Sequence, residues 1–217
     1  MKKLIILTYC VLWSVCSFAQ NPISLEAQAG LNVSTLHASG SDITLFGSGI
    51  GYSSIVGFHV GVRGTYDFQT PRGLYANAGV FLTSKGSSYD YTSIDFELYD
   101  KVRAYFLEFP VHAGYKYAFN NTLSVFGEFG PYFSVGLFGK TKISSSGGIT
   151  GGGEVTYDTF GEDHMKRFDM GLGLRCGIEL HKKYSLSVGY DFGLIDAYEG
   201  NQDQKHRNLS IGLGYKF

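Results

Sequence analysis

Three histidines lie beside acidic residues in hydrophilic stretches and are candidates for hydrolytic chemistry: His37 near Asp42, Glu162-Asp163-His164, and His206 near Asp203. Proteolysis or acyl transfer would need a serine as well, and Ser144 to Ser146 share a stretch with His164. Such histidines are usually only solvated, so we predict no catalytic residue. No H-x-x-x-H spacing supports a metal site, and the glycine-rich stretch 147–153 lacks the lysine of a phosphate loop. We predict no metal and no cofactor.

A second set of ionisable residues recurs at alternate positions of segments whose other positions carry no charge. Alternate residues of a strand face the same side, so we predict that these residues line the inside of a barrel as a lumen polar network: Glu26, His59, Arg63, Glu108, His112, Glu128, Arg175 and Glu179. Charges removed from bulk water must pair or stay hydrated. We interpret the network as Arg–Glu pairs and trapped water that lock the wall. A proton or small-ion path through the same groups is the alternative.

Eight segments with a period of two would position these residues. Each keeps one face free of charge while the other face is small, polar or charged; they span 23–34, 56–68, 74–83, 105–117, 123–137, 168–180, 184–194 and 208–217. A soluble β-sandwich shows the same alternation, but most of these segments reach or exceed the roughly nine to eleven residues that a membrane-spanning strand needs. The alternation predicts an all-β fold, a closed antiparallel eight-stranded transmembrane β-barrel, because lipid cannot satisfy an open sheet edge.

The connections between the segments alternate in length. Short turns are expected at 69–73, 118–121 and 181–183, and long loops at 37–54, 85–101, 139–166 and 196–206. Outer-membrane barrels have short periplasmic turns and long extracellular loops, so we expect both termini in the periplasm. The last segment ends on Phe217, which we interpret as an assembly signal read by the barrel-assembly machinery.

The amino-terminal residues have the layout of a secretory signal peptide. Lys2-Lys3 precede a short apolar stretch, and Ser17-Phe18-Ala19 supply small residues before a cut. We therefore expect a cleaved signal peptide over 1–19 and one barrel domain over 20–217. A formal net charge of -1 gives no indication of a nucleic-acid partner. Cys176 is the one cysteine outside the expected signal peptide, which excludes an internal disulfide in the processed chain.

Several motifs resemble a known family. Tyr105 to Val111 (YFLEFPV) resembles the Y-L-E-I-P-L segment of the PorT-type outer-membrane β-barrel family, and Gly130-Pro131-Tyr132 resembles its G-P-Y. Phe168 to Gly173, Gly189-Tyr190 with Gly193-Leu194, and Asn208 to Phe217 look like its last three strands. The resemblance implies an eight-stranded outer-membrane barrel with no known catalytic residues. For the member that names the family, it implies a link to a protein-secretion and gliding apparatus.

These patterns together predict an integral protein of the bacterial outer membrane that is not an enzyme. Its role would be structural or one of interaction through the long extracellular loops, with outer-membrane lipid as its surroundings and envelope or secretion proteins as possible partners. Two alternatives stay open at this point. One is a PorT-like accessory of a secretion apparatus, and the other is a narrow passive pore.

Overall fold

A computed structural model describes residues 23–38, 52–69, 73–93, 96–146, 153–161, 165–198 and 204–217. The expected signal peptide and the acidic or histidine residues Asp42, Glu162 to His164 and Asp203 lie outside these ranges. The described residues form nine strands: β1 (Ile23–Ala38), β2 (Tyr52–Asp67), β3 (Leu74–Ser93), β4 (Phe96–Ala118), β5 (Leu123–Ser146), β6 (Gly153–Asp158), β7 (Phe168–Leu180), β8 (Tyr184–Gly193) and β9 (Gln204–Lys216).

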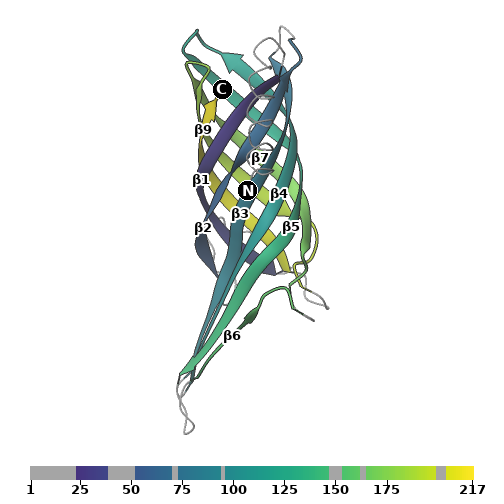
Figure 1. Ribbon diagram of the computed structural model, residues 1–217. Helices are drawn as coiled ribbons and strands as arrows, with labels where there is room; N and C mark the ends of the chain where they lie inside the picture. Colours follow the sequence, from purple (N-terminus) through teal and green to yellow (C-terminus); the bar gives the residue numbers. More distant parts are fainter. Residues whose placement is uncertain are drawn as a thin grey trace, which may run out of the picture.

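Eight of these strands close into an antiparallel barrel (Figure 1). The sheet runs β4-β3-β2-β1-β9-β8-β7-β5, and β4 pairs with β5 to close it. The first and last strands meet directly, with Ala29 opposite Leu213. The predicted fold class, an all-β closed antiparallel eight-stranded barrel, is confirmed. Closure leaves no open edge around the barrel wall, which is the condition for a sheet surrounded by lipid.

The alternation in the sequence becomes an apolar outside and a polar inside. Outward side chains such as Val62, Leu174 and Ile211 are half exposed or more. Residues beside them on the inside are buried, as at Arg63, Arg175 and Gly212. Polar residues therefore make up most of the interior, the reverse of a soluble domain. The tight turn at 181–183 lies where the sequence predicts it. There His181 and Lys182 adopt positive φ angles of 52° and 58° to reverse the chain.

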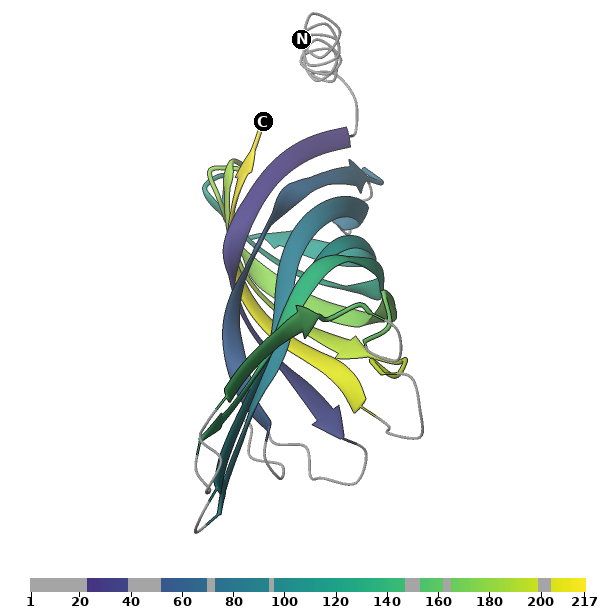
Figure 2. The same ribbon diagram turned by 60° about the horizontal axis from the view of Figure 1, so that its bottom comes forward.

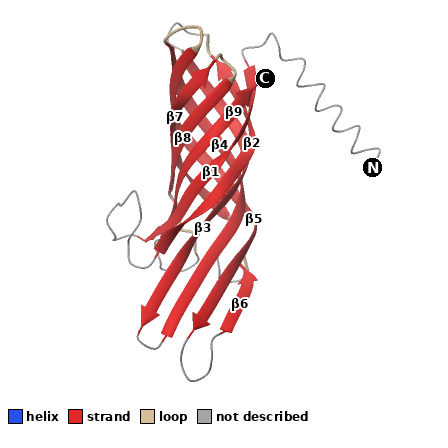
Figure 3. Ribbon diagram, turned by 90° about the vertical axis from the view of Figure 1, so that its left-hand side faces the viewer, coloured by secondary structure: helices blue, strands red, loops and turns tan. Residues whose placement is uncertain are grey.

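Two of the predicted long loops are wrong over much of their length. Within 85–101, β3 continues to Ser93 and β4 starts at Phe96; within 139–166, β5 continues to Ser146 and pairs with β6. These extensions form a four-stranded sheet of residues 85–93, 96–104, 139–146 and 153–158, which we call the arm (Figures 1 and 3). The prediction failed because it followed apolar alternation. The backbone ladder continues beyond the point where the outward positions become charged, as at Arg103 and Lys140.

The arm projects from the end of the barrel opposite the start of β1 and the carboxyl terminus (Figures 1 and 2). Two register irregularities lie where it leaves the barrel. In the β4–β5 pair, Tyr105 is opposite Phe138 and Phe106 is opposite Gly136, so Leu137 is an extra residue on β5. In the β2–β3 pair, the register shifts between Ser54 and His59, and β2 carries the extra residue. Both shifts are β-bulges, which bend a strand and increase its twist.

Candidate functional site

The lumen near the tight turns holds a buried ionic group centred on Arg63. Its guanidinium donates hydrogen bonds to Glu128 (Nη1 to Oε1, 2.7 Å) and to Glu26 (Nη2 to Oε1, 2.9 Å). Tyr75 and Asn77 donate to the other oxygen of Glu128 at 2.9 and 2.7 Å. Arg63 lies on β2 and Glu128 on β5, so this group connects walls that are not adjacent in the sheet.

Glu128 collects further contacts from β4 and β7, the two strands that flank β5 in the barrel. The Nδ1 atom of His112 lies 3.4 Å from its Oε1, and Arg175 Nη1 lies 3.5 Å from the same oxygen. The side chain of Ser185, on β8, donates to Glu26 at 2.9 Å. Charged and polar groups from β1, β2, β3, β4, β5, β7 and β8 therefore meet in one network. An uncompensated charge in such a place would be costly.

The turn end of the lumen is filled by a second ion cluster. Glu179 accepts hydrogen bonds from both Lys116 and Lys216, the former at 2.8 Å. These three residues and the Arg63 group line a cavity of about 20 Å³. A cavity of this size admits about one water molecule.

Lys85, the first residue of the arm on β3, is the centre of another ionic group, which lies in the lumen. Its side chain is fully buried, with Nζ at 2.7 Å from Glu108 and 3.5 Å from Asp169. The ammonium also lies 4.5 Å from the centroid of the Tyr132 ring, a cation–π contact. The sequence prediction missed Lys85 because it placed residue 85 in a loop. The period of two that runs inward through Tyr75, Asn77, Gly79, Phe81 and Thr83 reaches Lys85 next.

The structure places all eight predicted network residues on the inner face of the barrel. Six take part in ion pairs, and His112 contacts Glu128. His59 is buried against Phe81, with 6.3 Å between ring centroids, and its Nδ1 has no partner among the described residues. His206 differs from the prediction of a solvated loop residue. It lies in β9, is 2% exposed, and its ring is 5.6 Å from that of Phe106. His206 is thus part of the interior of the barrel.

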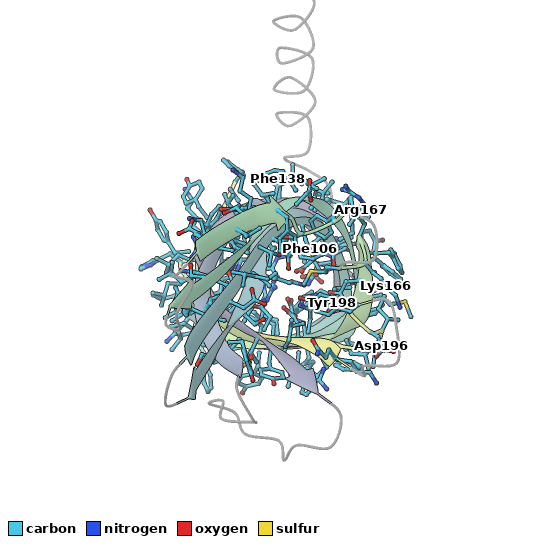
Figure 4. The ribbon with its side chains drawn as sticks, turned by 90° about the horizontal axis from the view of Figure 1, so that it is seen from below. Phe106, Phe138, Lys166, Arg167, Asp196 and Tyr198 are labelled. Carbon is cyan, nitrogen blue, oxygen red and sulfur yellow. The ribbon has the colours of Figure 1, made fainter. Side chains whose placement is uncertain are left out.

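An apolar cluster occupies the lumen where the barrel joins the arm, and we call it the plug: Leu36, Val102, Ala104, Phe106, Phe160, Met165 and Ala197. Phe106 and Phe160 meet edge to face at 5.6 Å, and Arg167 lies over the Phe160 ring at 5.0 Å. Phe106 is fully buried, whereas Phe138 on the outer face is 54% exposed (Figure 4). A Cβ at Gly136 would overlap the Phe160 ring, so this glycine makes room for the plug.

Solved structures with similar folds come from other bacterial barrels. Ail of Yersinia pestis, solved with the heparin analogue sucrose octasulfate, is 18% identical with a TM-score of 0.42, covering 90% of this chain and 99% of Ail. Neisserial surface protein A is 16% identical (TM-score 0.41; 89% and 97% covered). OprG of Pseudomonas aeruginosa is 13% identical (TM-score 0.43; 89% and 95% covered).

No curated protein matches the chain. Helices long and apolar enough to span a membrane are absent from the described residues. A family model described as "Outer membrane protein beta-barrel domain" matches residues 18–199, most of the length of the chain. With the closed eight-stranded barrel and its apolar outer face, this match establishes that the chain belongs to the outer membrane protein β-barrel domain family.

Proposed function

We propose that this protein is a non-enzymatic anchor in the bacterial outer membrane, with a sealed barrel and an arm that carries the interactions. The observation that carries the proposal is the division of the molecule: a barrel whose lumen holds buried ion pairs and the plug, continued by an arm whose strand β6 is exposed over most of its length. The arm would point away from the cell and both termini would lie in the periplasm, because the tight turns are at the other end.

The filled lumen supports an anchor over a pore. At the turn end the cavity beside Arg63 has room for about one water molecule. At the arm end, the plug joins β1 through Leu36, β4 through Phe106 and the segment before β9 through Ala197. Eight-stranded barrels have an interior just wide enough for side chains to fill.

The purified protein in planar lipid bilayers should therefore show no stepwise conductance. A porin reconstituted under the same conditions provides the positive control. A variant with Phe106→Ala and Phe160→Ala tests the contribution of the plug, and we expect it to stay closed because the Arg63 group still occupies the other end. Reproducible single-channel steps from the unmodified protein would contradict the anchor and favour the passive pore.

The arm offers exposed side chains and backbone to a partner. Tyr99 on β4 is 41% exposed and Val155 on β6 is 62% exposed. Among the strands that the structure describes, β6 pairs with β5 alone, so its outer edge resembles the strand edges to which extended segments add. The partner would be an envelope or surface protein. A role beside a secretion apparatus is a narrower form of the proposal, supported by the resemblance to the PorT-type family.

Site-specific photo-crosslinking in intact cells tests the arm. We expect a crosslinker at Tyr99 or Val155 to capture a discrete protein partner. A crosslinker at Phe119, which is 62% exposed in a tight turn, should not capture the same partner. Capture from Phe119 alone, identified by mass spectrometry, would place the interaction on the periplasmic side and overturn this assignment.

Three further expectations belong to the same proposal: the cleaved signal peptide over 1–19, assembly by the barrel-assembly machinery, and Phe217 as its signal. The Phe217 ring is 71% exposed, and its backbone N–H donates to Leu25 O at 2.9 Å, which ties the end of the chain to β1. Deleting Phe217 and measuring the inserted fraction by heat-modifiable gel migration would test the signal role.

A further inference from the structure

Four basic residues occupy neighbouring positions at the base of the arm. Arg103 on β4 is directly opposite Lys140 on β5, and Lys101 is directly opposite Lys142. Paired residues of two strands point to the same side, so all four lie on one face, which we call the basic patch. Arg103, Lys140 and Lys142 are exposed and Lys101 is half-buried. Like charges placed directly across a strand pair are destabilising, so the fold alone gives no reason for this arrangement.

The basic patch has few negative partners. Lys142 pairs with Glu154 of β6 at 2.9 Å, and both side chains are about half exposed. Asp158 is opposite Lys140 in register, but its carboxylate accepts the backbone N–H of Phe160 at 2.8 Å. Within the described ranges, Lys101, Arg103 and Lys140 form no ion pair. The face therefore keeps an excess of positive charge available to an outside ligand.

The same face continues into the aromatic surface of the barrel. The next pair towards the barrel is Tyr105 opposite Phe138, whose rings stack with centroids 4.7 Å apart. Phe58 on β2 adds a third ring, 6.1 Å from Tyr105. Exposed aromatic side chains in a girdle mark the membrane interface of such barrels. The basic patch lies immediately beyond this girdle, on the side that the arm occupies.

The depth of the basic patch can be estimated from strand geometry. A rise of about 3.3 Å per residue and a tilt of about 40° place Arg103 and Lys140 about 5 Å beyond the aromatic pair along the membrane normal. Lys101 and Lys142 lie about 10 Å beyond it by the same estimate. The polar headgroup layer of one leaflet is about 5–8 Å thick. Arg103 and Lys140 are therefore at headgroup depth, and Lys101 and Lys142 lie a few ångströms beyond it.

We propose that the basic patch binds the phosphate groups of phosphorylated lipid headgroups in the leaflet around the base of the arm. Arginine and lysine form charge-assisted hydrogen bonds with phosphate oxygens, and two adjacent cations can share one phosphate. Continuity with the aromatic girdle favours a ligand embedded in the membrane over a soluble polyanion. The inference rests on the proposed membrane location and is independent of any protein partner of the arm.

Binding of lipid A by the full chain, purified in detergent and stripped of lipid, tests this proposal. Native mass spectrometry would follow titration with bisphosphorylated lipid A and with its dephosphorylated form. We expect Arg103→Gln with Lys140→Gln to weaken binding of the bisphosphorylated form about tenfold or more, because each surface cation contributes measurably to attraction by anionic lipid. Binding of the dephosphorylated form should not change. The matched control removes two exposed cations of a tight turn, by Lys182→Gln with Lys183→Gln, and should leave both affinities unchanged.

The outcomes distinguish the phosphates of a lipid headgroup from a soluble phosphate compound as the ligand. Equal affinity of the patch variant and the unmodified protein for bisphosphorylated lipid A would overturn the proposal. The proposal would also be overturned if binding of soluble polyphosphate required the basic patch while lipid A bound equally well with and without its phosphates. The ligand of the basic patch would then be soluble. Heat-modifiable migration of every variant on gels shows that the barrel is still folded. If crosslinkers at Tyr99 and Val155 captured no partner while lipid A binding was intact, this result would contradict the proposed function but not the present inference.

Discussion

Replacing Arg63 with methionine is expected to destabilise the folded barrel by about 3–5 kcal/mol, the usual cost of removing one partner from a buried ion pair. The guanidinium is 3% exposed and is hydrogen-bonded to both Glu26 and Glu128. Without it, two carboxylates remain buried near each other with less compensation. Urea unfolding of the refolded protein in detergent micelles, followed by heat-modifiable migration or circular dichroism, measures the change.

Two companion variants decide whether the uncompensated charge is the cause. Lys142→Met removes one partner of an ion pair whose side chains are 53% and 57% exposed, and it should cost about 1 kcal/mol or less. Adding Glu26→Gln and Glu128→Gln to Arg63→Met should recover part of the lost stability, since the buried carboxylates are then neutral. If Arg63→Met costs no more than Lys142→Met, the lumen network does not hold the wall together.

Replacing Ile211 with arginine should cost about 2–4 kcal/mol in a lipid bilayer, the penalty for a cation on the lipid face of a barrel near the midplane. Ile211 lies near the middle of β9, opposite Leu31 and Val188, and its side chain is 50% exposed on the outer face. Urea unfolding of the protein in phospholipid vesicles gives the free energy of unfolding for each variant.

The arm supplies a matched control for this substitution. Val155 is also an exposed strand residue, at 62%, but we place it in water. Val155→Arg should therefore change stability by no more than about 0.5 kcal/mol, as is usual at an exposed surface. A cost at Val155 equal to that at Ile211 would contradict the assignment of the barrel wall to lipid and the arm to water.

The sequence predicted the structure well wherever one face of a strand meets lipid and the other face meets the polar lumen. Along β7, outward positions such as Leu174 alternate with lumen positions such as Arg175 and Glu179, so the inner and outer lists could be written from the period of two. The arm was missed because its outer face carries charged residues such as Arg103, Lys140 and Lys142, so the apolar alternation that marks a lipid-facing wall ends at its base. Lys85 was missed for the same reason, since it lies where the apolar alternation of β3 ends.

The partners within the lumen could not be predicted. Glu26 is opposite Arg63 in the β1–β2 register, and this pair follows from neighbouring strands. Glu128 reaches Arg63 across the interior, from a strand that is not its neighbour in the sheet. Which side chains meet across a barrel depends on strand tilt and stagger, and these are properties of closure. The same holds for His206, whose contact with Phe106 joins β9 to β4.

The strands β3, β4 and β5 run without interruption from the tight-turn end into the arm, so the arm has no hinge loop at its base. At the base of the arm there are instead two inserted residues, one at Leu137 on β5 and one in the 55–58 segment of β2. A ligand that pulls on the tip would transmit force through continuous hydrogen-bonded ribbons into the wall beside Arg63. The arm is therefore a continuation of the barrel wall, and the two inserted residues mark the level at which it leaves the barrel.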